Sequence, residues 1–320
     1  MDNPLVAHFC APVLIPTLCR FQHFKDCIES LKQNSLALQT DLYIALDYPF
    51  HESHHAGYAQ IAEYLERLEG FKKIVILKRP ENFGTKRNLE EAMALIFKKY
   101  DRCIISEDDN VFSPNFLEYM NKCLIAYSDD HSVLAINGYT HPFNVRYEQN
   151  TVFRGQTNFS AWGFGVWKDR LEEMNSIKQR SFFQHIVFTP KLLFKVYQSG
   201  AKNVRYLIGL SRKKNKKWPG DICYSLYMAA YDKYVIYPVI SKVRNMGWDG
   251  SGMNCNENSR EYDVYSQQII DQDKSFELKG NDWTAFKENK SNIIKYYSQG
   301  LIINIRTAIV LLCRLTGLIR

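Results

Sequence analysis

The chain has 320 residues, of which 46% are hydrophobic, and a formal net charge of +7 at pH 7. This size and apolar content suit a full hydrophobic core in one large domain or two smaller ones, and the 20 tyrosines and 19 phenylalanines argue against disorder over most of the chain. The moderate positive charge fits phosphate-bearing or membrane-surface partners without identifying either of them.

The first 140 residues alternate between strand and helix patterns. Strands are predicted at 11–17, 41–46, 73–77, 102–106 and 133–137, and helices at 21–33, 53–68, 85–100 and 113–127. This βαβ order predicts a mainly parallel sheet with helices on both faces. After about residue 140 the alternation weakens, and the glycine-rich stretch 247–252 is too loop-like for a strand.

Polar side chains gather at the predicted carboxyl ends of the strands. They lie in the segments 17–20, 47, 82–87 and 107–109. In sheets of this kind, ligands bind beyond the carboxyl ends of the strands. The convergence of these four segments therefore favours a ligand site at that edge.

Three consecutive acids, Glu107, Asp108 and Asp109, directly follow the apolar strand at 102–106. Carboxylates crowded in this way repel one another unless a cation or a donor-rich ligand compensates their charge. Mg²⁺ and Mn²⁺ prefer oxygen ligands and keep open positions for substrate phosphates. The triplet thus predicts a metal-bridged nucleotide site, although taken alone it fits a solvated acidic turn equally well.

The last segment differs in composition. Residues 301–320 are mostly aliphatic but contain three arginines, and residues 291–320 contain no acid. A helix spanning a bilayer would hold two of these arginines at depth, at about 2.5–3.5 kcal/mol each near the centre. A basic amphipathic helix lying on the membrane surface avoids that cost, and a terminal helix packed on the domain or on a second subunit is the alternative.

Four motifs resemble segments of the nucleotide-sugar glycosyltransferases of the GT-A fold. They are Ile104–Asp109 followed by Phe112–Phe116, Phe159–Trp167, Trp218–Asp221 and Val243–Ser251. The likeness covers about residues 10–255. It is nearest to the N-acetylglucosaminyltransferase I-like enzymes and to bacterial family-2-like enzymes of surface polysaccharide synthesis.

The resemblance implies a Rossmann-like α/β/α sandwich with a mainly parallel mixed sheet, followed by a C-terminal helical tail. A glycosyltransferase domain would occupy residues 1–255, with a nucleotide-binding half at 1–140 and an acceptor half at 141–255. A C-terminal extension at 256–300 and the basic membrane-surface helix at 301–320 would complete the chain.

The resemblance also assigns the site residues. Asp109 would be the direct ligand of Mn²⁺ or Mg²⁺, in an EDD variant of the DxD motif, and Asp221 would be the catalytic base. The donor-binding residues would be Thr17, Arg20, Asp47, Lys86, Arg87, Asn88, Glu107, Asp108 and Ser251, with Trp162 and Gly163 beside the sugar and the acceptor. Asp221 also suits a helix N-cap, and Trp167 suits the core.

These roles predict a metal-dependent, inverting glycosyltransferase that moves a sugar from a UDP-sugar to a glycan or lipid-linked acceptor in surface polysaccharide synthesis. The alternatives are a non-catalytic carbohydrate-binding or scaffold protein at the membrane and a sugar nucleotidyltransferase. A nucleotidyltransferase normally carries a glycine-rich, basic signature after its first strand, and Thr17–Arg20 does not supply one.

Three further features bear on partners and location. The eight cysteines form no CxxC pair and no Cys/His metal spacing, which favours buried thiols in a reducing compartment. The basic run 212–217 is expected to be a solvated loop, so no nucleic-acid partner is expected. Because the first residues show no signal peptide or anchor, we expect a cytoplasmic protein held peripherally on the inner face of the cell membrane.

Overall fold

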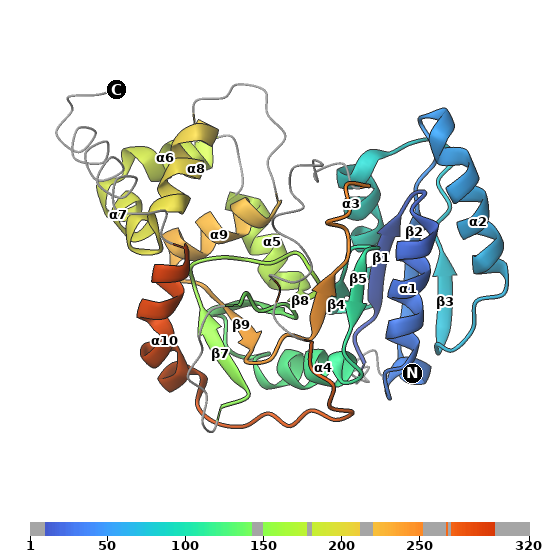
Figure 1. Ribbon diagram of the computed structural model, residues 1–320. Helices are drawn as coiled ribbons and strands as arrows, with labels where there is room; N and C mark the ends of the chain where they lie inside the picture. Colours follow the sequence, from blue (N-terminus) through green and yellow to red (C-terminus); the bar gives the residue numbers. More distant parts are fainter. Residues whose placement is uncertain are drawn as a thin grey trace, which may run out of the picture.

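The computed structural model describes residues 10–142, 150–177, 181–211, 220–251, 267 and 270–297. These residues form a mixed α/β fold around an eight-stranded sheet with the strand order β3-β2-β1-β4-β8-β6-β9-β7 (Figure 1). Its strands are β1 (Val13–Thr17), β2 (Asp41–Leu46), β3 (Lys73–Ile76), β4 (Arg102–Ile105), β6 (Val133–Asn137), β7 (Val152–Gly155), β8 (Phe164–Trp167) and β9 (Tyr234–Pro238). A separate antiparallel pair consists of β5 (Asn110–Phe112) and β10 (Val243–Asn245).

Most strands of the large sheet run parallel. β1 pairs in parallel with β2 and β4, β2 with β3, and β6 with β9. Two strands are reversed, since β8 lies antiparallel between β4 and β6 and β7 is antiparallel to β9. The predicted α/β class with a mainly parallel mixed sheet is therefore confirmed.

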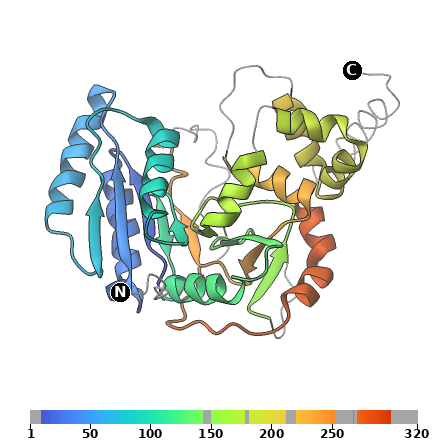
Figure 2. The same ribbon diagram turned by 180° about the vertical axis from the view of Figure 1, so that it is seen from behind.

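Helices cover both faces of the sheet, as the two opposite views of Figures 1 and 2 show. They are α1 (Phe21–Lys32), α2 (His55–Glu66), α3 (Gly84–Ile96), α4 (Phe116–Ala126), α5 (Lys168–Ile177), α6 (Ser181–Phe188), α7 (Pro190–Gln198), α8 (Ala201–Ser211), α9 (Gly220–Tyr231) and α10 (Asp282–Tyr297), with short 3-10 turns at Ala37–Gln39 and Glu52–His54. Strand alternation explains the two layers. In β1, Val13 and Ile15 face the apolar cluster of α1, α2 and α4, whereas Leu14 faces the cluster of α3 and α5 to α9.

The region after the acidic triplet differs from the sequence-based prediction. Residues 110–112 form a strand, β5, and the next helix begins at Phe116 instead of residue 113. The reason is a long-range pairing, because β10 binds β5 and the Ser113 N–H continues this pairing by donating to the Lys242 carbonyl at 2.9 Å. A three-residue strand paired with a segment over 100 residues away leaves too short a pattern to read from the sequence.

The described part of the C-terminal extension packs back onto the domain. Asp271 forms a buried ion pair with Lys242 and accepts a hydrogen bond of 3.0 Å from the Asn115 side chain. Arg154 of β7 pairs with Asp282 at the start of α10. These contacts anchor residues 270–297 to the sheet and its flanking loops.

Two of the composition-based predictions concern cysteines and membranes. Among the described residues, Cys10, Cys19, Cys27, Cys103, Cys123 and Cys223 are free thiols, and the expected burial is confirmed for all of them except the half-buried Cys19. Among the described helices, none combines the length and apolar character needed to cross a bilayer. Residues 301–320 and the basic run 212–217 lie outside the described residues.

Replacing Asp271 with asparagine should leave the charge of Lys242, which is only 3% exposed, buried without its partner. Breaking a buried ion pair from one side is strongly destabilising, so we expect the free energy of unfolding in urea to fall by about 3 kcal/mol. The matched control is Lys279→Met, because Lys279 pairs with Glu277 on the surface and should contribute less than about 0.5 kcal/mol. Equal losses in the two variants would contradict the structural role given to the buried pair.

Candidate functional site

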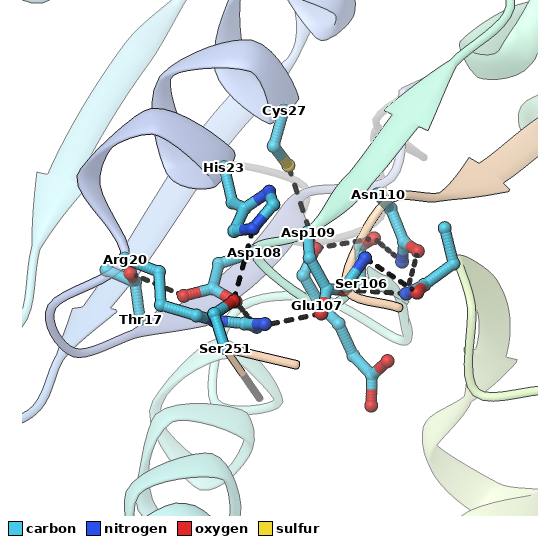
Figure 3. Close-up of polar contacts among 12 residues, drawn as sticks. Thr17, Arg20, His23, Cys27, Ser106, Glu107, Asp108, Asp109, Asn110 and Ser251 are labelled. Carbon is cyan, nitrogen blue, oxygen red and sulfur yellow. Dashed lines mark hydrogen bonds and ion pairs between the residues drawn. The ribbon is translucent and has the colours of Figure 1, made fainter. Parts of the chain in front are cut away.

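The acidic triplet lies between β4 and β5, beside the end of β1 (Figure 3). The Asp108 carboxylate accepts a hydrogen bond of 2.8 Å from the Thr17 hydroxyl, and its other oxygen pairs with the Arg20 guanidinium. The same guanidinium lies 2.8 Å from Oδ2 of Asp109. Arg20 thus bridges two neighbouring acids, and the structure brings together four of the residues expected at the site, namely Thr17, Arg20, Asp108 and Asp109.

The strand β10 supplies the other half of the Asp109 environment. Asn245 donates from its side-chain amide to Oδ1 of Asp109 at 2.7 Å, and the Met246 N–H donates to the Asp109 carbonyl at 2.8 Å. Gly247 approaches so closely that a Cβ at that position would lie 2.1 Å from Oδ2 of Asp109. Asn245 and Gly247 belong to the motif Val243–Ser251, but the sequence did not predict their contacts with Asp109, because these depend on the pairing of β10 with β5.

Electrostatics in the cluster follow from this crowding. Desolvation, together with the charges of Asp109 and Asp108, raises the pKa of Glu107 to about 8. Because the Glu107 side chain is exposed to solvent, repulsion from the two neighbouring acids is the main physical reason for the rise. Burial also raises the pKa of Asp108, and Arg20 opposes that rise. Although burial alone would lower it, Asp108 and Asp109 raise the pKa of Arg20 above its ordinary value.

Asp221 stands at the first turn of α9, exposed to solvent. Its charge contributes to the raised pKa of Glu107, which places the two carboxylates within electrostatic range of one another. Since α9 begins at Gly220, Asp221 lies inside the first turn instead of at the N-cap, and the N-cap alternative is wrong. The Asp221 carbonyl accepts a hydrogen bond of 2.9 Å from Ser225, whose hydroxyl also accepts one from the Phe159 N–H at 3.0 Å.

Asp47 is buried at the end of β2, where its carboxylate closes the loop before α3. It accepts hydrogen bonds from the backbone N–H groups of Tyr48, Phe83 and Gly84 at 2.8–2.9 Å. Its own N–H donates to the Thr17 carbonyl at 2.9 Å, which brings it beside the β1 end of the site. In this structure its contacts are therefore those of a loop anchor.

The first turn of α3 carries the remaining expected donor residues, Lys86, Arg87 and Asn88. Lys86 and Arg87 are exposed and pair with glutamates of α3 and the preceding loop, while Arg87 also covers the Phe83 ring at 3.6 Å. Asn88 is buried and donates to the Ala45 carbonyl at 2.8 Å. Within the described residues, the polar contacts found for these three side chains are with α3, β2 and the loop between β3 and α3, away from the acidic triplet.

The turn after β10 is tied to α1 through His23. Asp249 lies 2.8 Å from Nε2 of His23, and the Ser251 hydroxyl donates to Asp249 at 2.6 Å and lies 3.3 Å from the same histidine nitrogen (Figure 3). Burial by itself would raise the pKa of Asp249, but the hydrogen bonds from Ser251 and His23 together lower it to about 2. The expected site residue Ser251 is thus held against α1 by Asp249, which belongs to the motif Val243–Ser251, and by His23, which the sequence reading did not single out.

Aromatic rings surround the other expected sugar-binding position. Trp162 is half-buried and contacts Tyr139 and Trp248 edge-on, with ring centroids 4.5 and 6.1 Å apart. Gly163 adopts a positive φ of 64°, and a Cβ there would lie 2.9 Å from Val243, so both backbone geometry and packing require glycine. Trp167 is buried, as predicted for a core residue.

The donor set of the cluster fits a hard divalent cation that is completed by a ligand. Two carboxylates, those of Asp108 and Asp109, share one guanidinium and so keep an excess of negative charge, and carboxylate oxygens are the ligands that Mg²⁺ and Mn²⁺ prefer. Within the described residues, no group of three or more His, Cys, Asp or Glu side chains is arranged to hold a metal ion by itself. A cation here would thus rely on few protein ligands, with phosphates and water filling the other positions.

Neither the scan against models of protein families nor the search of curated proteins finds a match to this sequence. Solved structures are similar to it in fold. S. aureus TarS has a TM-score of 0.36 at 14% identity over 52% of this chain, and its 1-349 segment has a TM-score of 0.35 at 13% identity over 52%. The chain covers only 30% and 49%, respectively, of those two chains.

A third structure is the mannosyltransferase PcManGT from Pyrobaculum calidifontis in complex with GDP-Man and Mn²⁺. Its TM-score is 0.39 at 10% identity, and the match covers 72% of this chain and 71% of that one. At this level, each likeness concerns the fold alone.

Replacing Gly247 with alanine should force its Cβ and the Asp109 carboxylate apart. Overpacking of a tight contact typically costs about 1–3 kcal/mol, and we expect a loss of that size in urea denaturation. Gly220→Ala is the matched control, because a Cβ at Gly220 would meet nothing within 4 Å and should change the free energy of unfolding by less than about 0.5 kcal/mol. A Gly247→Ala protein as stable as the control would refute the close approach.

The raised pKa of Glu107 predicts a pH-dependent stability. A carboxyl group with a raised folded-state pKa contributes stability that is fully present below its ordinary value of 4.5 and is lost as the pH rises through about 8. Glu107→Gln should thus unfold at higher urea concentration than the wild type at pH 9, while the two should be alike at pH 5. Glu277→Gln, on the surface, should match the wild type at both pH values. A constant offset of Glu107→Gln at pH 5 and pH 9 would disprove the coupling.

Proposed function

We propose that this protein is a metal-dependent, inverting glycosyltransferase of the GT-A type that uses a nucleotide sugar, with a UDP-sugar as the donor to test first. The observation that carries the proposal is the bridge from Arg20 to Asp108 and Asp109 at the carboxyl ends of β1 and β4, closed on its other side by Asn245. This is the edge at which α/β sheets bind nucleotides.

In the proposed reaction, Asp109 would hold the cation, while Thr17, Arg20 and Asp108 would position the donor around it. A bound Mn²⁺ or Mg²⁺ would supply Lewis-acid neutralisation of the leaving diphosphate. Ser251 would donate to a phosphate from the turn after β10. In the structure the Ser251 hydroxyl donates to Asp249, so it would exchange this partner for the phosphate.

Asp221 would remove the proton from the acceptor hydroxyl as that oxygen attacks the sugar. A base acting opposite the leaving diphosphate gives a single displacement, which inverts the anomeric centre. Glu107, which directly precedes Asp108, would contact the donor sugar. Its raised pKa favours the protonated form, which can donate a hydrogen bond.

The remaining assignments are extensions of the same proposal. Trp162 and Gly163 would line the sugar and acceptor position, with Trp248 and Tyr139 extending the aromatic surface. Asp47 would face the nucleobase of the donor. Lys86, Arg87 and Asn88 would approach the nucleotide from the first turn of α3, which requires that their present contacts on α3 and β2 rearrange.

The acceptor we propose is a glycan or a lipid-linked saccharide of surface polysaccharide synthesis. The catalytic domain would end near residue 255, and peripheral contact with the inner face of the cell membrane would come from residues 301–320, which lie outside the described residues. The acid-free composition of residues 291–320 supports that contact.

Two substitutions separate metal binding from catalysis. Asp109→Asn should abolish transfer and weaken Mn²⁺-dependent binding of UDP by about 10–100-fold, as loss of a metal-site group does. Asp221→Asn should lower kcat by about 10²–10⁴-fold, the usual effect of losing a general base, while UDP binding stays within about twofold. Calorimetry measures binding, and release of the nucleoside diphosphate from a panel of nucleotide sugars measures turnover.

Asp129→Asn is the matched control, since Asp129 is exposed on a loop away from the triplet and should leave both readouts unchanged. Normal turnover in Asp221→Asn would remove its role as base. A wild-type protein that gives no heat with Mn²⁺ and any nucleotide sugar would refute the proposed function as a whole, and binding without turnover would favour a non-catalytic carbohydrate-binding protein.

A further inference from the structure

Charge is distributed very unevenly along this chain. Residues 174–220 contain eleven lysines and arginines and no aspartate or glutamate. All 34 acidic residues therefore lie elsewhere, together with 30 of the 41 basic ones, and the rest of the chain is net negative. The positive net charge of the protein thus resides in one segment, which includes α6, α7 and α8.

These three helices gather at one end of the molecule, beyond α9 and far from α1 and α2 in both views (Figures 1 and 2). Their inner sides belong to the main apolar core through residues such as Phe183, Ile186, Leu193, Val196 and Leu207. The helical group is therefore firmly packed on the domain, and its outer side has a defined orientation.

Large aromatic rings and basic side chains of α6, α7 and α8 are exposed to solvent. Phe188 is 71% exposed, Phe194 50% and Tyr206 37%, while Lys191 and Arg205 are also exposed. Lys191 and Phe194 lie three residues apart on α7 and so share one face of that helix. We call these five residues the α6–α8 surface.

An exposed phenylalanine gains nothing from water, and a basic patch needs no phenylalanine to bind a soluble polyanion. Surfaces that combine aromatic rings with lysine and arginine suit the boundary between lipid headgroups and acyl chains, where rings enter the apolar layer and cations meet phosphates. We propose that the α6–α8 surface rests on an anionic lipid membrane, with Phe188 and Phe194 inserted and Lys191 and Arg205 facing the headgroups.

This contact is separate from the one proposed for residues 301–320 and does not depend on the chemistry at Asp109. It does bear on access to the site, since α9, whose first turn holds Asp221, packs against α7 and α8. The ion pair between Lys195 of α7 and Asp232, just after α9, links the same elements. A docked α6–α8 surface would consequently hold the Asp221 end of α9 at a constant height above the lipid.

The test is flotation of the full chain with vesicles of phosphatidylcholine alone or with 30% phosphatidylglycerol. We expect the wild type to float with the anionic vesicles, and to do so less as salt is raised. Phe188→Ser and Phe194→Ser should each reduce the partition coefficient by about tenfold, because a ring leaves the apolar layer. Lys191→Gln should reduce it by about fivefold.

Matched controls come from the opposite end of the sheet. Phe50→Ser removes a ring that is 60% exposed, and Lys98→Gln removes an exposed lysine after α3, so neither should change flotation. Thermal melting of every variant establishes that the fold is retained. Calorimetry with UDP and Mn²⁺ is read in parallel, so a failed glycosyltransferase proposal remains distinguishable from a failed docking proposal.

Two results would overturn the inference. If the Phe188 and Phe194 variants float like the wild type, the membrane contact lies elsewhere, with the tail at 301–320 as the next place to look. If the protein prefers dextran sulfate to anionic vesicles and only Lys191→Gln weakens binding, the α6–α8 surface binds a soluble polyanion instead of lipid.

Discussion

The arrangement at the candidate site depends on one guanidinium held between two adjacent carboxylates. Asp108 and Asp109 leave β4 side by side, and without compensation their repulsion in a buried position would oppose folding. Arg20, at the end of β1, pairs with both and so joins the carboxyl ends of the two strands. Because one positive charge meets two carboxylates, it compensates their repulsion and still leaves the group with a net negative charge, which favours the binding of a cation.

The position of Asp109 is controlled by contacts that begin far from it in the sequence. The buried pair of Lys242 with Asp271 anchors the start of β10, and β10 pairs with β5. Asn245 at the end of β10 then binds the Asp109 carboxylate, and Gly247 lies directly against it. The C-terminal extension is thereby connected to the candidate metal ligand through one short strand, so it supports the site as well as the fold.

The acidic cluster and the α6–α8 surface differ in chemistry and in place. The acidic cluster lies at the carboxyl ends of β1 and β4, in the middle of the strand order, whereas α6, α7 and α8 lie at one end of the molecule (Figure 1). Helix α9 packs on the second and carries Asp221 toward the first. If the surface binds lipid, a lipid-linked acceptor would reach Asp221 from the membrane while the donor occupies the acidic edge, and both proposals would then describe one geometry.

The sequence predicted the α/β class and the alternation of strands and helices along the first 140 residues, because hydrophobic periodicity marks buried strands. It also predicted that Thr17, Arg20, Asp108 and Asp109 gather, because parallel strands bring their carboxyl ends to one edge. The sequence did not predict the contacts that Asn245, Gly247, His23 and Trp248 make, since each of these contacts joins residues about 80 to 230 positions apart. The close packing of Asn88 and the loop-anchoring contacts of Asp47 were equally hidden. Local pattern determined which residue types stand at the strand ends, and tertiary pairing alone decided which of them touch, because hydrogen bonds and ion pairs depend on distances that chain order does not specify.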